Sequence, residues 1–237
     1  MLEAAHRVLA PRTYFEIGTR TGRSLALARC PAIAVDPAFR LESGFAEARP
    51  DLRLFPMTSD DFFAAHDPAA LFGAPIELGF LDGMHCFEFL LRDFINAERF
   101  ATPASVLVLH DCAPFSSAIV DRAEFAPRVA ELDVMPRAWA GDVWKLLPIL
   151  RDYRPDLTLA VFDCPPTGLV FVSGLDPSSR RLSEAYEEIV ARYMDSDITA
   201  LSVTAFNESL GIRRSRRAMA EGDAALARHL APGRVMA

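Results

Sequence analysis

The sequence lacks the cysteine patterns that mark disulfide-bonded, zinc-binding or redox-active proteins. It has four cysteines among 237 residues, all widely spaced and without a C-x-x-C pair: Cys30, Cys86, Cys112 and Cys164. Zinc sites and redox motifs depend on closely spaced cysteines, and small secreted scaffolds depend on many of them. The pattern therefore excludes these classes and favours a reducing cytoplasm, where we expect the protein to be localised.

Long apolar runs and an excess of positive charge are also missing. No window reaches the roughly 20 apolar residues that span a membrane, and the first ten residues lack the basic and apolar regions of an export signal. The net charge of −7 argues against a nucleic-acid partner, because phosphate binding relies on clustered Lys and Arg. The basic run at 213–217 is an exception, with a solvated helix face or tail as its simpler interpretation.

What is present is enough apolar material for one α/β domain, organised around residues 13–36. The hydrophobic fraction is 51%. The segment TYFEIGTRTGRSLALARCPAIAVD predicts a strand, a glycine turn, a helix over Ser24–Ala28 and a second strand that stops at Asp36. Such a unit binds nucleotides, since the turn brings backbone N–H groups close to a ligand and the acid accepts hydrogen bonds from a ribose. The G-x-G-x-x-G fingerprint of dinucleotide sites is absent.

Four predicted strands end in acidic residues, at Glu16, Asp36, Asp82 and Asp111, and His110 comes directly before the last of them. The carboxyl ends of parallel strands meet at one edge of an open α/β sheet, where ligands bind. Two later strands, 157–162 and 169–172, are joined by a connection too short for a parallel crossover, so we expect an antiparallel hairpin.

The motifs together resemble class I S-adenosylmethionine (SAM) methyltransferases. The E-x-G-x-x-x-G turn and Asp36 are similar to the first two motifs of that family, and the resemblance extends over about residues 13–175. Asp82-Gly83-Met84-His85 and His110-Asp111 are similar to the small bacterial branch of macrocin-type O-methyltransferases and cephalosporin-hydroxylase-like proteins. The resemblance implies a Rossmann-like, doubly wound, mostly parallel seven-stranded sheet with an antiparallel C-terminal hairpin.

The resemblance also implies SAM as the cofactor and a small molecule or glycan precursor as the acceptor. The cofactor-binding residues expected on this basis are Glu16, Gly18, Thr19, Arg20, Gly22, Asp36 and Asp60. Asp60 is expected to face the adenine amino group, while its alternative role is to favour a helix start after Thr58 or Ser59. Arg20 is expected to contact the methionine carboxylate, or else to be a surface charge.

Three interpretations remain open for the predicted catalytic residues, Asp82, His85, His110 and Asp111. In one, Asp82 and Asp111 hold Mg²⁺, which lowers the pKa of an acceptor hydroxyl. In another, His85 or His110 is a general base helped by a carboxylate and no metal binds. In the third, His110 is a buried structural histidine and Asp111 caps a helix. A metal site of this family usually has two adjacent acids after the fifth strand, and His110 stands in one of those places.

We expect a single domain over 1–210, with residues 113–142 forming a lid or substrate-side insertion. The segment 211–237 is basic and rich in Ala, and is expected to be a peripheral helix, a contact in a homo-oligomer or a frayed tail. The rival functions are an NAD-dependent oxidoreductase and a non-catalytic nucleotide-binding protein. The missing G-x-G-x-x-G turn and the predicted hairpin count against the first, and the polar cluster counts against the second.

Overall fold

The computed structural model describes residues 1–42, 51–122, 138–198 and 202–232. Its centre is one seven-stranded sheet in the order β3-β2-β1-β4-β5-β7-β6. All neighbouring strands are parallel except β7, which runs antiparallel to both β5 and β6. The strands are β1 (Tyr14–Ile17), β2 (Ala32–Val35), β3 (Leu52–Phe55), β4 (Leu78–Leu81), β5 (Val106–His110), β6 (Thr158–Phe162) and β7 (Leu169–Ser173). The expected sheet and its antiparallel hairpin are confirmed.

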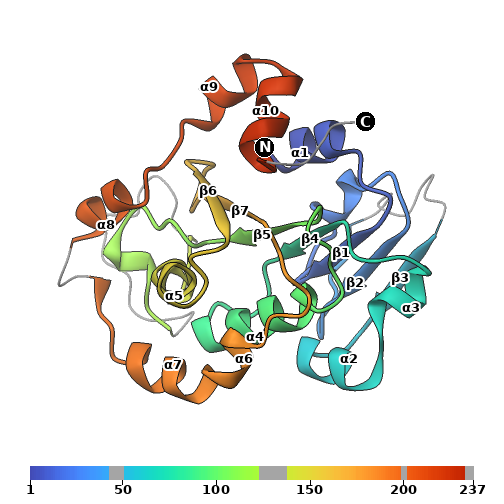
Figure 1. Cartoon of the computed structure of the whole chain (residues 1–237), viewed down its shortest axis with the longest axis horizontal. Helices are drawn as coiled ribbons and strands as arrows, with labels where there is room; N and C mark the ends of the chain where they lie inside the picture. The colour runs from blue at the N-terminus through green and yellow to red at the C-terminus, as the bar shows by residue number, and fades with distance from the viewer. Residues whose placement is uncertain (43–50, 123–137, 199–201, 233–237) are drawn as a thin grey trace.

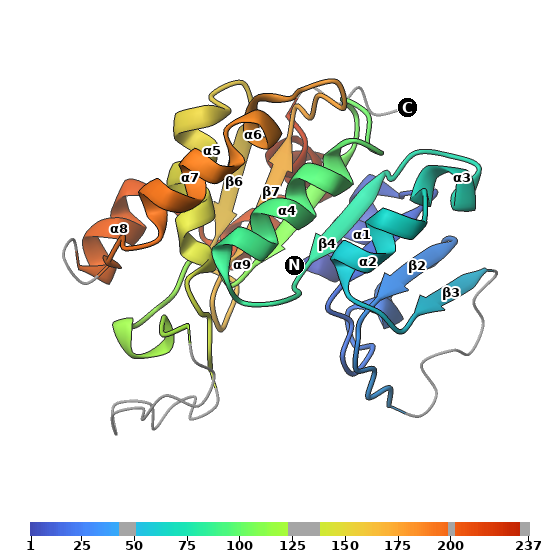
Figure 2. The ribbon, with the colours of Figure 1, turned by 90° about the horizontal axis from the view of Figure 1, so that it is seen from below.

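Helices cover both faces of the sheet, because the central strands are buried on both sides. Phe15 and Ile17 of β1 pack into one apolar cluster, while Tyr14 belongs to the other. Figure 2 shows α4 crossing in front of the sheet, with α2 beside it. The helices of the first cluster are α2 (Ser59–Ala65), α3 (Pro68–Phe72), α4 (Phe87–Glu98), α5 (Leu146–Tyr153), α6 (Arg181–Glu184), α7 (Tyr186–Tyr193) and α8 (Val203–Ser209).

The opposite face is covered by both ends of the described chain. Helix α1 (Leu2–Leu9) lies beside α10 (Asp223–Leu230), as Figure 1 shows, and Arg7 forms an ion pair with Asp223 at 2.7 Å. Leu226 and Leu230 are fully buried there, and α9 (Ser215–Ala220) precedes them. In the segment expected as a peripheral helix, oligomer contact or tail, the described residues thus form two helices that complete the core of this face.

The connection between β1 and β2 differs from the prediction. The expected helix over Ser24–Ala28 is a single 3-10 turn, η1 (Leu25–Leu27), because only 14 residues separate the two strands and the glycine turn takes several of them. The N-terminal and C-terminal helices supply the cover that a longer helix would have given. Two further 3-10 turns are η2 (Ser117–Ile119) and η4 (Val143–Lys145).

The sequence is ambiguous between strand and loop over 198–205, and it predicts a short helix around 45–48. In the first of these segments, residues from Val203 onward belong to α8, which Ser202 caps through its hydroxyl, and residues 199–201 lie outside the described part of the chain. The short helix expected near 45–48 lies outside the described residues, as does half of the expected lid, residues 123–137. Among the described residues, no helix is long and apolar enough to cross a membrane.

Candidate active site at the carboxyl edge of the sheet

The glycine turn after β1 lies directly against the end of β4. Gly18 has a φ of 82°, and a Cβ built on it would come within 1.8 Å of the Asp82 carbonyl oxygen. Only glycine fits there, since both the conformation and the space exclude a side chain. The expected cofactor turn and the first residue of the polar cluster are therefore neighbours at one edge of the sheet.

Asp36 organises this turn through its carboxylate. Its Oδ2 accepts a 2.6 Å hydrogen bond from the backbone N–H of Arg20, and its Oδ1 accepts a 2.7 Å bond from that of Ala38. Arg20 is held with a positive φ of 46°, and its side chain is exposed. Each carboxylate oxygen has a second lone pair, so these bonds leave acceptor capacity for the ribose diol that we expect at Asp36.

Glu16 lies beneath the turn with no exposed surface. Its Oε2 accepts a 2.6 Å hydrogen bond from the Tyr14 hydroxyl, while its Oε1 and the Thr19 hydroxyl oxygen have no hydrogen-bond partner among the described residues. Burial raises the pKa of Glu16 to about 7, although the hydrogen bond from the Tyr14 hydroxyl acts to lower it. A buried carboxylate without full compensation favours a cationic ligand at this position.

Asp60 is engaged in an ion pair. Both of its oxygens accept hydrogen bonds from Arg92, at 2.9 and 2.7 Å. It lies in the first turn of α2, where Thr58 is the N-cap through its hydroxyl. Asp60 therefore lies where the helix-start interpretation places it. Its contact with adenine stays a prediction.

The four predicted catalytic residues form one cluster at the ends of β4 and β5. His110 Nδ1 lies 3.1 Å from Asp82 Oδ1 and 3.1 Å from Asp111 Oδ2. His85 Nδ1 lies 3.3 Å from the same oxygen of Asp111, and its Nε2 is 3.7 Å from Asp82 Oδ1. Adjacent residues of an extended strand would point apart, but Asp111 leaves the strand with a φ of 61° and turns back beside His110. Asp111 caps no helix, since Ser116 is the N-cap of the next element, η2.

The contacts fix where the histidine protons lie. His85 Nδ1 faces the Trp139 carbonyl oxygen at 3.0 Å as well as the Asp111 carboxylate. Both neighbours only accept hydrogen bonds, so Nδ1 carries the proton and Nε2 keeps the lone pair in the neutral ring. His110 Nδ1 faces two carboxylates and is a donor for the same reason.

The charges of His110 and Asp111 stabilise each other. Burial alone would lower the pKa of His110, but Asp82 and Asp111 outweigh it and raise the pKa well above its usual value. Burial alone would likewise raise the pKa of Asp111, yet the charge of His110 and its hydrogen bond hold that pKa low. Asp111 is 4% exposed, and its carboxylate contacts both histidines.

A segment before η4 clamps His85 in place. The Trp139 ring stacks on the imidazole, with centroids 4.5 Å apart and an interplanar angle of 12°. Gly141 packs so closely that a Cβ would lie 1.9 Å from the His85 carbonyl oxygen, and the Asp142 N–H donates to that oxygen at 3.2 Å. Trp139 thus contacts the expected catalytic histidine, whereas Trp144 is 5% exposed and fills core.

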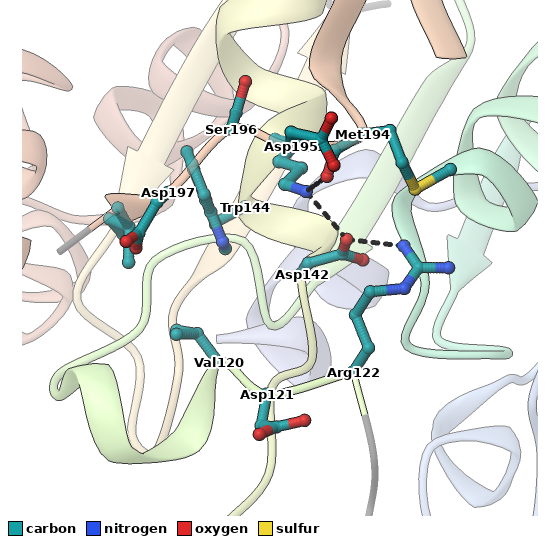
Figure 3. A pocket seen from close by; sticks show the side chains of 11 residues that line it. Val120, Asp121, Arg122, Asp142, Trp144, Met194, Asp195, Ser196 and Asp197 are labelled. Carbon is teal, nitrogen blue, oxygen red and sulfur yellow. Dashed lines mark hydrogen bonds and ion pairs between the residues drawn. The ribbon is translucent and has the colours of Figure 1, made fainter. Parts of the chain in front are cut away.

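Asp142 also forms one wall of a cavity of about 300 Å³ beyond the clamp. Its Oδ2 binds Arg122 at 2.6 Å, as Figure 3 shows, and Lys145 at 3.0 Å, while its Oδ1 accepts from the Phe87 N–H at the start of α4. These bonds tie the cavity wall to the loop that carries His85. Other residues that line the cavity are Val120, Asp121, Trp144, Met194, Asp195, Ser196, Asp197 and Ile198.

A metal ion fits this cluster only in part. Asp82, His85 and Asp111 offer ligand atoms within 4.8 Å of one another. However, the oxygens of Asp82 and Asp111 that face each other already share the N–H of His110. A cation at the two carboxylates would compete with that imidazole for the same lone pairs, so the arrangement around His110 does not favour the expected Mg²⁺.

Several residues that support the site had no signal in the sequence. Thr167 donates a hydrogen bond to Asp111 Oδ1, and Asp142 binds the His85 loop. Asp93 is buried under this region, close to the Gly83 backbone, and burial raises its pKa to about 7. In the sequence the Gly141-Asp142 pair lies between Trp139 and Trp144, but that pattern does not indicate a contact with His85.

No family model and no curated protein matches the chain. Among solved structures, it resembles the O-methyltransferase TomG of Streptomyces achromogenes, which is involved in tomaymycin synthesis and was solved with SAM. The TM-score is 0.51 at 18% identity, over 74% of this chain and 78% of that one. The methyltransferase PaMTH1 of Podospora anserina, solved with S-adenosylhomocysteine (SAH), gives a TM-score of 0.50 at 10% identity, over 74% and 76% of the chains. The protein therefore has the Rossmann-like fold of these SAM-dependent methyltransferases.

Proposed function

We propose that the protein is a SAM-dependent methyltransferase that methylates a hydroxyl group of a small molecule or glycan precursor. The observation that carries the proposal is the contact between the two halves of the site. Gly18 of the expected cofactor turn touches Asp82 of the polar cluster, so a ligand in the turn lies next to groups that handle protons. The shared fold with methyltransferases supports the same conclusion.

The residues around the turn fit this cofactor. The buried Glu16 Oε1 and Thr19 Oγ1 atoms, which have no partner among the described residues, suit the ammonium group of its methionine part. Asp36 suits the ribose diol. When bound, SAM supplies an electrophilic methyl group on a sulfonium. The glycine turn and the two acids would hold the cofactor at the carboxyl edge of β1, β2 and β4.

His85 is the proposed general base. Its Nδ1–H is held by the Trp139 carbonyl oxygen and Asp111, so Nε2 is the atom that accepts the proton of the acceptor hydroxyl. The side chain is 21% exposed, compared with 6% for Asp111, and so remains within reach of an acceptor. The carboxylates of Asp82, 3.7 Å from Nε2, and Asp111, 3.3 Å from Nδ1, then stabilise the imidazolium of His85, and the proton leaves Nε2 to solvent after the transfer. The proposed mechanism needs no metal.

The rival functions make different demands on the same residues. An NAD-dependent oxidoreductase would use Asp36 for a ribose, but the acidic Glu16 beneath the turn is poorly suited to a pyrophosphate. A non-catalytic binding protein would need the turn but not a base held in one tautomer. The contacts of His85 therefore favour an enzyme.

The test is SAH formation from SAM with a panel of phenols, sugars and nucleosides as acceptors. We expect turnover with at least one class, and its loss in His85→Gln. His229→Gln is the matched control, because His229 lies on α10 and pairs with Glu221 at 2.8 Å, far along the chain from the cluster. Undiminished turnover in His85→Gln would contradict the assigned base. Tight SAM binding without any turnover would favour the non-catalytic alternative.

A further inference from the structure

The antiparallel hairpin delivers one residue to the catalytic edge. Its register pairs His110 of β5 with Leu169 of β7. Because β7 runs against β5, the turn that precedes β7 lies at the same edge as the residues that follow β5. A parallel strand would place its preceding turn at the opposite edge of the sheet. The last residues of this turn, Thr167 and Gly168, are therefore neighbours of 111–113.

Two backbone contacts fix this neighbourhood. The Ala113 N–H donates to the Thr167 carbonyl oxygen at 2.9 Å. Gly168, with a φ of 81°, packs so closely that a Cβ would lie 2.6 Å from the Ala113 side chain. These contacts of the Thr167 carbonyl group and of Gly168 with Ala113 hold Thr167 beside Asp111.

The Thr167 side chain uses this position to bind Asp111. Its hydroxyl donates to Asp111 Oδ1, and the residue is 1% exposed, so no solvent replaces the bond. The other oxygen, Oδ2, faces the Nδ1 atoms of His110 and His85 at 3.1 and 3.3 Å. The carboxylate therefore has one oxygen anchored to the hairpin and the other directed at both histidines.

We propose that Thr167 is a positioning residue that orients the Asp111 carboxylate toward His85 and His110. This inference rests on the proposed function, in which His85 Nε2 accepts the acceptor proton. A hydroxyl suits the task because it donates one directed bond without adding charge to the cluster. Without this hydroxyl, the buried Oδ1 of Asp111 would lose the hydrogen bond that anchors it to the hairpin. The carboxylate would then be free to turn away from the imidazoles.

The test follows the imidazole signals of the full chain by NMR at constant pH. The chain has five histidines, and His85→Gln and His110→Gln variants assign the two signals of interest. Thr167→Val keeps the side-chain size and removes the donor. We expect it to displace the His85 and His110 signals and to leave those of the other three histidines in place. Thr167→Ser, which keeps the hydroxyl, is expected to restore both signals to their wild-type positions.

Ser173→Ala is the matched control, since Ser173 is buried at the far end of β7 and its hydroxyl has no partner among the described residues. It is expected to move neither signal. If Thr167→Val does not fold, Thr167→Ala removes the same donor without the branched side chain. Unmoved His85 and His110 signals in the valine or alanine variant, or no restoration by serine, would overturn the proposal. If the wild-type protein does not bind SAH, the proposed function is refuted instead. The NMR result does not depend on that outcome, so the two failures can be told apart.

Discussion

Glu16 should make the ligand-free protein less stable as the pH rises. Its pKa is raised from 4.5 to about 7 by burial, so folding favours its neutral form. The resulting loss in the free energy of unfolding is absent below about pH 4.5, where Glu16 binds the proton in both the unfolded and the folded state. It grows as the pH rises from about 4.5 to 7 and is complete above the folded pKa. A shift of this size corresponds to about 3 kcal/mol at pH 8.5.

Glu16→Gln removes this loss while it keeps an acceptor for the Tyr14 hydroxyl. We expect the ligand-free variant to be more stable than the wild type at pH 8.5, by up to about 3 kcal/mol, and nearly equal to it at pH 4.5. The same change should weaken SAH binding by roughly 30-fold, since a hydrogen bond to a charged group contributes about 2 kcal/mol. A residue that costs stability and improves binding is typical of a ligand site.

Urea denaturation at several pH values, followed by tryptophan fluorescence, measures the first effect, and calorimetry measures the second. Asp93→Asn is the matched control, because burial also raises the pKa of Asp93 to about 7 and it is not among the proposed ligands of the cofactor. It should gain stability at high pH and keep its SAH affinity. The reasoning fails if Glu16→Gln follows the wild-type pH dependence, or if it binds SAH as tightly as the wild type.

Four further predictions follow from the same geometry. Asp36→Ala should weaken SAH binding at least tenfold in calorimetry and keep the far-UV circular dichroism of the wild type; equal affinity would remove the ribose assignment. Gly18→Ala should lower the melting temperature, because its Cβ would lie 1.8 Å from the Asp82 carbonyl oxygen, and an unchanged value would show that the turn is looser than described. His85→Gln should lower turnover by roughly 100-fold or more with SAH affinity retained, as expected for loss of a general base. Treatment with a chelator should leave turnover unchanged, and a requirement for added Mg²⁺ would restore the metal interpretation of Asp82 and Asp111.

The strands and their directions were predictable from local signals, whereas the seven-stranded sheet was expected from the resemblance to a family. Gly18 and Asp36 belong to one short motif whose residues must be close in space for the turn to form. The antiparallel hairpin followed from the length of its connection alone. The prediction of a helix over Ser24–Ala28 was wrong, since the sheet is covered there by α10, almost 200 residues later. Local patterns do not reveal such a distant substitute.

The members of the polar cluster were predictable, but their geometry was not. Strand ends placed Asp82, His85, His110 and Asp111 at one edge, since parallel strands share that edge. The side chains of His110 and Asp111 lie together because Asp111 has a left-handed backbone conformation. Residues other than glycine rarely adopt this conformation, so the sequence does not predict it at Asp111. The support from Asp142 comes from a segment more than 50 residues from His85, joined only by tertiary packing.

The central claim is that the glycine turn binds SAM. Calorimetric titration of the chelator-treated protein with SAH, with NAD in parallel and both repeated with Mg²⁺, tests it most directly. We expect micromolar binding of SAH, no binding of NAD, and no change on adding Mg²⁺. Binding of NAD, or no binding of SAH in either condition, would contradict it.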